Sequence, residues 1–376
     1  MIIFHTLIYI QKITIFANLK KVKIVNKSIN IFDTKIVPLR KKKTRLRYRV
    51  AVIGGGSWAT AIVKILSANL EHIHWWVREE EIVEGITKFG HNPLYSSSVY
   101  INPEDVYIST DIRKVVARAD YVVIVTPSAF LQKTLAPLKK SRLNKKKIIN
   151  AVKGIVPESM QLITDYLRSE FDVPVSNLAS ISGPSHAEEV AREKFTYLTA
   201  CSENIELAET VAKIFSNRFV RTSVSKDIMG AEMSIVLKNI YALGAGIYSG
   251  LGYGDNFLAA YIANCVKEME KFINEVYPNP DRRLTDSVYL GDLLVTAYSS
   301  FSRNRLFGNM IGHGLTVRIA QMEMNMIAEG YYASRCIHEI NKIYDVYIPI
   351  AEAIYGVLYE GHNVQSEMNR ISEHFI

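Results

Sequence analysis

The sequence contains little cysteine, and its cysteines are far apart. Only three occur in 376 residues, Cys201, Cys265 and Cys336. An odd number at wide spacing fits neither a disulfide framework nor a zinc site, so the pattern favours a reducing, cytoplasmic compartment. His72 and His74 form a close histidine pair, but no cysteine or carboxylate cluster accompanies them in the sequence. We therefore expect no metal site.

Acidic residues are almost absent from the first 49 residues, where Asp33 stands against 13 lysines and arginines. The remainder carries a small excess of acid, so the formal net charge of +8 gives no reason to expect nucleic acid or anionic lipid as a partner. The apolar stretch at residues 2–10 precedes the charges and is too short to span a bilayer. We expect no signal peptide and no stable membrane insertion. Residues 1–48 are predicted to be a disordered extension, or to precede the mature protein.

Glycines gather directly after a short β-branched run at residues 50–53. Gly54 and Gly56, followed by Ala59, fit the dinucleotide-binding fingerprint with its third glycine relaxed to alanine. In that fingerprint one glycine permits a tight turn, and the next lets the backbone approach a pyrophosphate. The N-terminus of the following helix offers N–H donors to the anion. An ordinary glycine turn is the alternative, but the flanking strand and helix patterns favour a nucleotide site.

Strand and helix patterns alternate up to about residue 228. Apolar runs typical of buried parallel strands lie at residues 50–53, 72–77, 121–126, 147–153, 178–182 and 196–200. They predict an α/β fold with a Rossmann-type doubly wound sheet over residues 49–228, whose ligand crevice lies at the carboxyl ends of the strands. From residue 229 only helical patterns follow, at 231–248, 256–276, 288–298, 317–327, 333–343 and 350–359. Residues 229–376 are therefore predicted to form an all-α domain, and the candidate residues described below make it the substrate-binding and catalytic domain.

Polar residues stand at the ends of three predicted strands. Arg78 ends the second strand, where an arginine suits the 2′-phosphate of NADP. Glu79 and Glu80 follow at once and leave the cofactor choice open, and a solvated strand end is the alternative. Lys153 ends a later strand, and the string Ser-Gly-Pro-Ser-His-Ala-Glu at 182–188 ends the next. Two such ends at one crevice favour a substrate-binding floor over plain connections.

The helical part carries three further candidates. Lys238 lies inside an apolar helical segment, and a buried lysine is a candidate for proton transfer, whereas a lysine whose stem lies along the surface is the alternative. Asp292 lies in another apolar stretch. Ser302-Arg-Asn-Arg-Leu-Phe-Gly308 places two arginines and an asparagine around what we expect to be a glycine-closed turn. Guanidinium groups pair phosphate oxygens bidentately, so this string suits phosphate binding.

Taken together, these strings resemble the bacterial type of NAD(P)-dependent glycerol-3-phosphate dehydrogenase. The resemblance rests on GGGSWATA, AVKGI, ISGPSHAEE, LKNIYALGAGI, GDLLVTAYS, SRNRLFG and AEGYYA, and runs in order from residue 49 to about residue 359. It implies reduction of dihydroxyacetone phosphate to sn-glycerol 3-phosphate, which supplies the glycerol backbone of phospholipids. The implied cofactor is NADP or NAD, with NADPH favoured by Arg78. The resemblance is compatible with a cytoplasmic homodimer.

The resemblance also assigns roles to individual residues. It makes Lys238 the catalytic proton donor and acceptor, and it implies no metal. It places at the substrate Lys153, Gly183, Ser185, Lys238, Asn239, Asp292, Thr296, Ser302, Arg303 and Asn304. It places at the cofactor Gly54, Gly56, Ser57, Trp58, Arg78, Phe130, Lys153, Ala187, Arg303, Ile327 and Glu329.

Two other functions fit parts of the sequence. A related Rossmann-plus-helical dehydrogenase could act on a hydroxyacid or an acyl-CoA, but such an enzyme would not need a phosphate pocket around Arg303. A nucleotide-binding sensor without catalytic activity would be expected to lose Lys238 or Asp292, and both are present. The dehydrogenase acting on a phosphorylated substrate accounts for all the strings.

Overall fold

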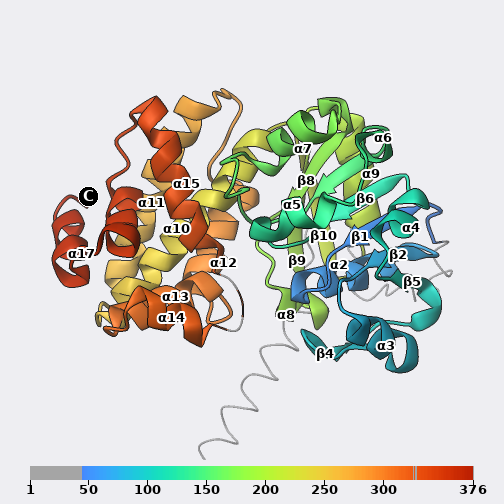
Figure 1. Ribbon diagram of the computed structural model, residues 1–376. Helices are drawn as coiled ribbons and strands as arrows, with labels where there is room; N and C mark the ends of the chain where they lie inside the picture. Colours follow the sequence, from blue (N-terminus) through green and yellow to red (C-terminus); the bar gives the residue numbers. More distant parts are fainter. Residues whose placement is uncertain (1–44, 325, 327, 376) are drawn as a thin grey trace, which may run out of the picture. The chain divides into compact units, whose positions relative to one another are not determined.

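The computed structural model describes residues 45–324, 326 and 328–375, here called the folded unit (Figure 1). Most of the predicted extension, residues 1–44, lies outside the described residues. Its last four residues are placed, and they contact the folded unit. Arg45 Nη1 donates to Asp105 Oδ1 at 2.6 Å, and Leu46 forms a parallel bridge with Leu70. Residues that precede the first strand therefore already contact the folded unit, through a side-chain ion pair and a backbone bridge.

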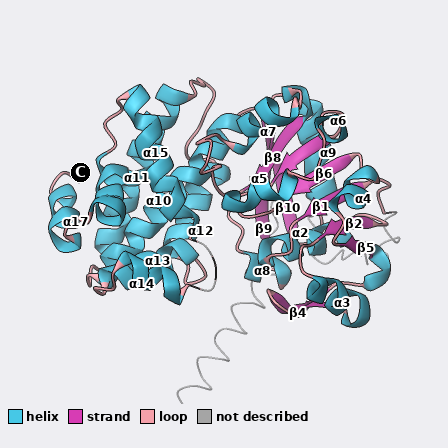
Figure 2. Ribbon diagram, in the orientation of Figure 1, coloured by secondary structure: helices cyan, strands magenta, loops and turns pink. Residues whose placement is uncertain are grey.

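An eight-stranded sheet organises the first part of the unit, in the order β10-β9-β8-β7-β6-β1-β2-β5 (Figure 2). Neighbouring strands are parallel except β8 and β9, which are antiparallel. The strands are β1 (Val50–Ile53), β2 (Ile73–Trp76), β5 (Val106–Ser109), β6 (Tyr121–Ile124), β7 (Lys147–Asn150), β8 (Leu178–Ser182), β9 (Thr196–Cys201) and β10 (Val220–Ser225). The strand order reverses between β1 and β6, which is where doubly wound sheets bind ligands.

Both faces of this sheet are buried. Along β1, Val50 and Val52 pack into one hydrophobic cluster, whereas Ala51 and Ile53 pack into another. Successive side chains of a strand point to opposite faces, so each face has its own layer of helices. The helices of this part are α2 (Ser57–Ser67), α3 (Glu80–Phe89), α4 (Ile112–Ala117), α5 (Leu131–Leu135), α6 (Lys140–Leu143), α7 (Ile163–Phe171), α8 (Ala187–Ala191) and α9 (Ile205–Phe215).

The predicted doubly wound sheet is confirmed, but it has two strands more than the six that were predicted. Strands β5 and β10 form the two edges of the sheet. Neither has the unbroken apolar run of a central strand, and most of their residues are partly or fully exposed. An edge strand needs less apolar sequence, which is why the pattern missed both. A short antiparallel hairpin of β3 (His91–Asn92) and β4 (Ser96–Tyr100) lies apart from the main sheet.

The rest of the described chain is helical, as predicted. The helices are α10 (Ile228–Gly250), α11 (Asp255–Val276), α12 (Asp292–Tyr298), α13 (Arg303–Gly312), α14 (Val317–Glu323), α15 (Glu329–Tyr344), α16 (Pro349–Tyr355) and α17 (Val364–Ser372). Helix α10 is buried along nearly its whole length, because α11, α12, α13, α15 and α16 pack around it. Its apolar residues accordingly surround the helix instead of forming one stripe. Among the described residues, no helix combines the length and the apolarity needed to cross a bilayer.

The expected turn after Ser302 is instead the helix α13. Ser302 is its N-cap, and the Ser302 side chain accepts a hydrogen bond from the backbone N–H of Arg305. Gly308 does not close a turn, because it lies where α13 crosses α10. A Cβ atom at Gly308 would lie 1.9 Å from the carbonyl oxygen of Leu243, so a side chain there would drive the two helices apart. The glycine in this string is needed for close packing.

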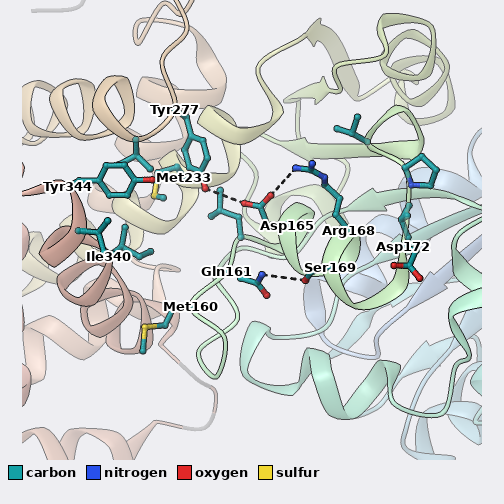
Figure 3. Close-up of a pocket in the computed structure, with 16 residues that line it drawn as sticks. Met160, Gln161, Asp165, Arg168, Ser169, Asp172, Met233, Tyr277, Ile340 and Tyr344 are labelled. Atoms are coloured by element: carbon teal, nitrogen blue, oxygen red, sulfur yellow. Dashed lines mark hydrogen bonds and ion pairs between the residues drawn. The ribbon is translucent and has the colours of Figure 1, made fainter.

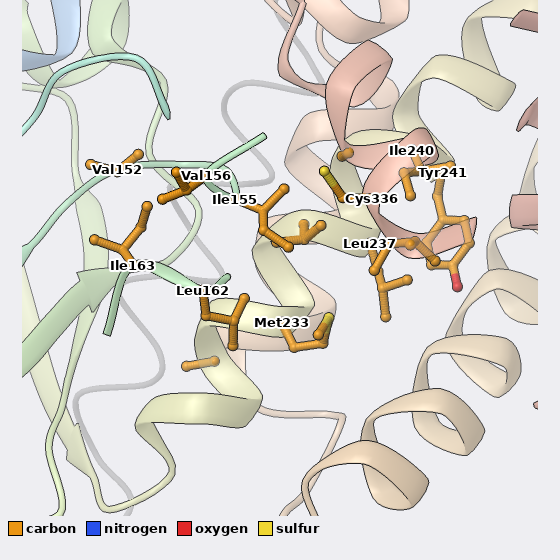
Figure 4. Close-up of a cluster of buried hydrophobic side chains, with 14 of the residues drawn as sticks. Val152, Ile155, Val156, Leu162, Ile163, Met233, Leu237, Ile240, Tyr241 and Cys336 are labelled. Atoms are coloured by element: carbon orange, nitrogen blue, oxygen red, sulfur yellow. The ribbon is translucent and has the colours of Figure 1, made fainter. Parts of the chain in front are cut away.

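The hydrophobic core continues from the sheet into the helical part. Figure 4 shows Val152 and Ile155, which follow β7, in one cluster with Met233 and Leu237 of α10. The same cluster extends to Ile371 in α17. The division into domains at residue 228 therefore stays a prediction, since the two parts share one core.

Candidate active site

The glycine turn between β1 and α2 has the geometry that the fingerprint requires. Gly54 has φ +143°, and a Cβ atom there would lie 2.8 Å from the carbonyl oxygen of Val125. Gly56 is the N-cap of α2, and a Cβ atom there would meet no heavy atom within 4 Å. Within the described part of the chain, no side-chain cap is bonded to the first backbone N–H groups of the helix. The turn thus has open space in front of these donors.

A cavity of about 630 Å³, here called the glycine-turn cavity, opens at this turn. The sheet part and the helical part both contribute to its wall. The predicted cofactor residues that line it are Gly54, Gly56, Ser57, Trp58, Arg78, Phe130, Lys153, Arg303 and Glu329. Residues separated by more than 250 positions in the sequence therefore meet here, and the volume is sufficient for a sizeable ligand.

A smaller cavity of about 90 Å³, the lysine cavity, adjoins the first. Its wall contains the predicted residues Ser57, Trp58, Lys153, Ser185, Ala187, Lys238, Asn239, Thr296, Ser302, Arg303, Asn304 and Glu329. Five of these also line the glycine-turn cavity, namely Ser57, Trp58, Lys153, Arg303 and Glu329. The two cavities are consequently one continuous site with a larger and a smaller end.

A buried ion pair lies at the smaller end. Lys238 Nζ, from α10, is 2.5 Å from Asp292 Oδ2, from α12, and their side chains are 3% and 1% exposed. Lys238 Nζ also lies 3.3 Å from Thr296 Oγ1, which itself donates to the carbonyl oxygen of Asp292 at 2.6 Å. Asp292 lines neither cavity. Its carboxylate instead lies behind Lys238 and fixes the position of the ammonium.

Side-chain amides connect the elements around this pair. Asn239 Nδ2 donates to the carbonyl oxygen of Lys153 at 2.8 Å, and Asn304 Nδ2 donates to Asn239 Oδ1 at 2.9 Å. Asn304 Oδ1 in turn accepts from the backbone N–H of Gly330 at 2.9 Å. These bonds join the loop after β7 to α10, α13 and α15. Because every amide has a partner, the network holds these four segments in fixed register.

Lys153 lies between the two ends of the site. Its Nζ donates to the carbonyl oxygen and to Oγ of Ser185, at 3.1 and 3.2 Å, and lies 4.9 Å from the ring centroid of Trp58. Burial lowers the pKa of Lys153 to about 8, and the nearby Asp292 carboxylate opposes this shift. Lys153 is therefore an ammonium group that can lose its charge just above neutral pH.

Glu329, like Lys153, lines both cavities. Its Oε1 accepts from the backbone N–H of Ser128 at 3.1 Å and its Oε2 from Ser128 Oγ at 2.5 Å. Burial raises the pKa of Glu329, while the bonds from Ser128 oppose the shift. This contact ties α15 to the segment after β6.

One predicted site residue besides Asp292 lies outside the walls of both cavities. Gly183 lines neither cavity; it has φ +140°, and its carbonyl oxygen accepts from Ser185 Oγ at 2.8 Å. It shapes the turn that presents Ser185. Ile327 lies outside the described residues.

Known proteins of one family match this chain along most of its length. The family models for the N- and C-terminal parts of NAD-dependent glycerol-3-phosphate dehydrogenase match residues 49–208 and 227–369. The chain belongs to this family. It is similar to glycerol-3-phosphate dehydrogenase [NAD(P)+] of Oceanobacillus iheyensis, with 36% identity over 86% of this chain and 94% of that one. The Bacillus subtilis protein of the same name is 33% identical over 86% and 93%.

A solved structure supports the same assignment. The crystal structure of glycerol-3-phosphate dehydrogenase from Coxiella burnetii superposes with a TM-score of 0.79 at 26% identity. The superposition covers 86% of this chain and 98% of that chain. The likeness therefore extends over the sheet part and the helical part together.

The sequence patterns missed several residues of the site. His186, Glu188 and Phe301 also line the lysine cavity, and Glu79 and Tyr95 line the glycine-turn cavity. Their signal was present, since His186 and Glu188 lie inside the string at 182–188 and Glu79 directly follows Arg78. The sequence could not show which of these adjacent residues belong to the site, because only the turn geometry decides which of them faces the cavity.

Glu232 was missed for a different reason. Its buried carboxylate lies behind the site, where Oε1 accepts from Asn150 Nδ2 at 2.7 Å and from Thr164 Oγ1 at 2.8 Å. Asn150 Oδ1 accepts from the backbone N–H of Val152, next to Lys153. Burial raises the pKa of Glu232, and these hydrogen bonds oppose the shift. In the sequence it is one glutamate in an apolar helix, with nothing to indicate that it supports the Lys153 loop.

A larger cavity, of about 770 Å³, lies beside α7 (Figure 3). Asp165 lines this cavity and accepts two hydrogen bonds, from Arg168 Nη1 to Oδ1 and from the Tyr277 hydroxyl to Oδ2, each at 3.3 Å. None of the predicted site residues lines it. Within the described residues, no three histidine, cysteine, aspartate or glutamate side chains are grouped so that they could hold a metal ion. Those predicted site residues that line a cavity therefore lie at the glycine-turn and lysine cavities.

Proposed function

We propose that this chain catalyses the NAD(P)H-dependent reduction of dihydroxyacetone phosphate to sn-glycerol 3-phosphate. The observation that carries the proposal is the continuous wall that leads from the glycine turn to the buried Lys238–Asp292 pair. Membership of the family and the names of its relatives support the same reaction. The sheet part, residues 49–228, serves as the cofactor domain in this proposal, and the helical part, residues 229–376, serves as the substrate domain.

The glycine-turn cavity fits a dinucleotide. The open space at Gly56 and the N–H groups at the start of α2 suit a pyrophosphate. When bound, the reduced nicotinamide supplies the hydride for C2 of the substrate. The five residues shared by both cavities lie where the cofactor and the substrate would meet, with Lys153 and Trp58 among them.

The residues of the lysine cavity bind and polarise the substrate. Negative charge develops on the C2 oxygen during reduction, and the Lys238 ammonium stabilises this charge and donates the proton that completes the hydroxyl group. Asp292 keeps the ammonium in place. Arg303 lines both cavities. Among the described residues, the one hydrogen bond of its side chain runs from Nη1 to the Met326 sulfur, at 3.8 Å. Its guanidinium is thus free to pair with the substrate phosphate.

Binding at the phosphate also contributes to the reaction at C2. Interactions far from the reacting atoms fix the substrate, so the carbonyl is held where Lys238 can act on it. Ser302 and Asn304 flank Arg303 in the wall of the lysine cavity, at the start of α13. We place the phosphate at this helix end, and the dihydroxyacetone part between Lys153 and Lys238.

Purified protein, dihydroxyacetone phosphate and either NADH or NADPH test the proposal directly. We expect the absorbance of the reduced nicotinamide to fall only when the phosphorylated substrate is present. Dihydroxyacetone without its phosphate is the matched control, and a chiral assay identifies the product as the sn-3 isomer. Turnover of a hydroxyacid or an acyl-CoA substrate, without turnover of dihydroxyacetone phosphate, would overturn the proposal.

The proposal extends to the setting of the enzyme. We place it in the cytoplasm, acting on a small-molecule substrate and without a nucleic-acid partner. The three cysteines are free and buried, which suits a reducing compartment. Analytical ultracentrifugation of the purified chain distinguishes a monomer from the homodimer with which the resemblance is compatible.

A further inference from the structure

Glu79 lies at the glycine turn, and one of its two carboxylate oxygens accepts no hydrogen bond from the described residues. It lines the glycine-turn cavity beside Gly54, Gly55 and Gly56. A Cβ atom built on Gly55 would lie 3.3 Å from Glu79 Oε2, so this oxygen reaches the turn itself. Although Glu79 is the N-cap residue of α3, its side chain caps no backbone N–H. Among the described residues, no donor is recorded for Oε2.

The other oxygen of Glu79 holds Arg78. Glu79 Oε1 accepts from Arg78 Nη2 at 2.5 Å and from Arg78 Nε at 3.0 Å. The expectation that Arg78 favours NADPH treated its guanidinium as free for a 2′-phosphate. In the structure two of its nitrogens are already paired with a carboxylate. The Arg78 side chain is 69% exposed, so the pair lies at the mouth of the cavity.

The surrounding charge is also unfavourable to an additional phosphate. Glu80 and Glu81 follow Glu79 in the first turn of α3. Of the basic residues that line the cavity within the described chain, Lys153 and Arg303 also line the lysine cavity, so Arg78 alone lies at the α3 end. A phosphate monoester carries a charge of about −1.5 to −2 at neutral pH, and nearby carboxylates repel it. A ribose hydroxyl is uncharged and donates to a carboxylate.

We propose that Glu79 selects NADH over NADPH, by accepting a hydrogen bond from the adenosine ribose through Oε2 and by repelling a 2′-phosphate. Dinucleotide folds of this kind place an acidic residue after the second strand to bind the ribose 2′-hydroxyl. Glu79 fits this description because it follows β2 and reaches the glycine turn. Its Oε2 also has no hydrogen-bond donor among the described residues. The inference rests on the proposed function for the identity of the cofactor. It replaces the expectation that NADPH is favoured.

Equilibrium binding tests this inference without catalysis. Trp58 and Trp76 line the cavity, so their fluorescence reports binding of NADH or NADPH in the absence of substrate. We expect the Kd for NADPH to exceed that for NADH by about tenfold or more in the unaltered protein. Glu79→Gln keeps an acceptor oxygen but removes the charge and releases Arg78. We expect this variant to lose most of the difference, mainly through tighter NADPH binding.

Glu80→Gln is the matched control. It removes the same charge from the next residue, but Glu80 does not line the cavity, and its Oε1 accepts from Thr110 Oγ1 at 2.7 Å. We expect its ratio of the two Kd values to stay within about twofold of that of the unaltered protein. Equal or tighter binding of NADPH by the unaltered protein, or an unchanged ratio in Glu79→Gln, would overturn the inference. If Arg78→Ala lost binding of NADPH but not of NADH, the inference would also be overturned, because Arg78 would then bind the 2′-phosphate.

The outcomes separate this inference from the proposed function. Preferential NADH binding without reduction of dihydroxyacetone phosphate would reject the proposed reaction and leave the role of Glu79 intact. Reduction of dihydroxyacetone phosphate that prefers NADPH would reject the role of Glu79 and leave the proposed reaction intact.

Discussion

The two ends of the site are built in different ways. At the glycine turn, the backbone that lines the cavity comes from consecutive residues between β1 and α2. The lysine cavity instead takes its side chains from the loop after β7, from the segment that leads from β8 into α8, and from α2, α10, α12, the start of α13 and α15. The first end depends on local backbone conformation, whereas the second exists only when seven separate segments are packed together. We therefore expect substitutions at the two ends to affect different properties of the protein.

The two ends also differ in how charge is treated. The Arg78–Glu79 pair at the turn is partly exposed, so solvent screens it and it contributes little to stability. The Lys238–Asp292 pair is almost completely buried. Removal of one partner of a buried pair leaves an uncompensated charge, which typically costs about 3–5 kcal/mol. Function at the lysine end is thus inseparable from the packing around it.

The largest effect is expected for Lys238→Ala. Loss of a positioned general acid typically lowers kcat by about 10²- to 10⁴-fold. Binding of the dinucleotide, measured by fluorescence, should remain nearly unchanged, since Lys238 does not line the glycine-turn cavity. The double variant Lys238→Met/Asp292→Asn removes both charges and leaves no unpaired charge buried. If it folds and has lost the same activity, misfolding of the single variant does not explain the loss. Retention of more than about a tenth of kcat would shift the acid role to Lys153.

Gly56→Ala should separate cofactor binding from folding. A Cβ atom there meets no protein atom within 4 Å, so we expect the unfolding free energy to change by less than about 0.5 kcal/mol. The same atom occupies the space in front of the turn, and we expect the Kd for the dinucleotide to rise on the order of 10²-fold.

Gly254→Ala is the control, since its Cβ atom is equally unopposed and Gly254 lines neither cavity. An unchanged cofactor Kd in Gly56→Ala would mean that the dinucleotide does not bind close to this turn.

Arg303→Lys should weaken the substrate end while the charge is kept. An ammonium cannot supply the paired N–H groups of a guanidinium, and a hydrogen bond to a charged group contributes about 1.5–3 kcal/mol. We expect the KM for dihydroxyacetone phosphate to rise about tenfold to a hundredfold. Arg305→Lys is the matched control, because Arg305 lies on the same helix and lines neither cavity. Equal effects in the two variants would remove Arg303 from the phosphate site.

The smallest effect concerns pH. Burial lowers the pKa of Lys153 to about 8, so the group is an ammonium below that pH and becomes neutral above it. If its charge helps to bind the substrate phosphate or the C2 oxygen, the KM for dihydroxyacetone phosphate should rise by about tenfold between pH 7 and pH 9. Lys153→Arg keeps the charge throughout this window and should flatten the profile. A pH profile in the arginine variant identical to that of the unaltered protein would show that another group titrates.

The accuracy of the sequence-based expectations differs between the same two ends. The glycine turn and the six inner strands of the sheet follow from short contiguous patterns, because strands inside a sheet that is covered on both faces are rich in apolar residues. The string at 302–308 stays a prediction as a phosphate site; Ser302, Arg303 and Asn304 line the lysine cavity, but the turn expected for the string is the helix α13. Its glycine resembles a turn residue, and only the crossing of α13 with α10 explains it. Glu232, which supports the loop of Lys153, had no sequence signal of its own.

The sequence by itself determined the class of fold, the position of the glycine turn and which polar residues stand at strand ends or inside apolar helices. These properties depend on residues close together in the chain, through backbone conformation and hydrophobic periodicity. Only the tertiary structure decided that Lys238 contacts Asp292, that Lys153 lies between the two cavities, and that Glu79 already holds Arg78. Contacts between side chains depend on how separate segments pack and which way each residue faces, and a local pattern contains neither.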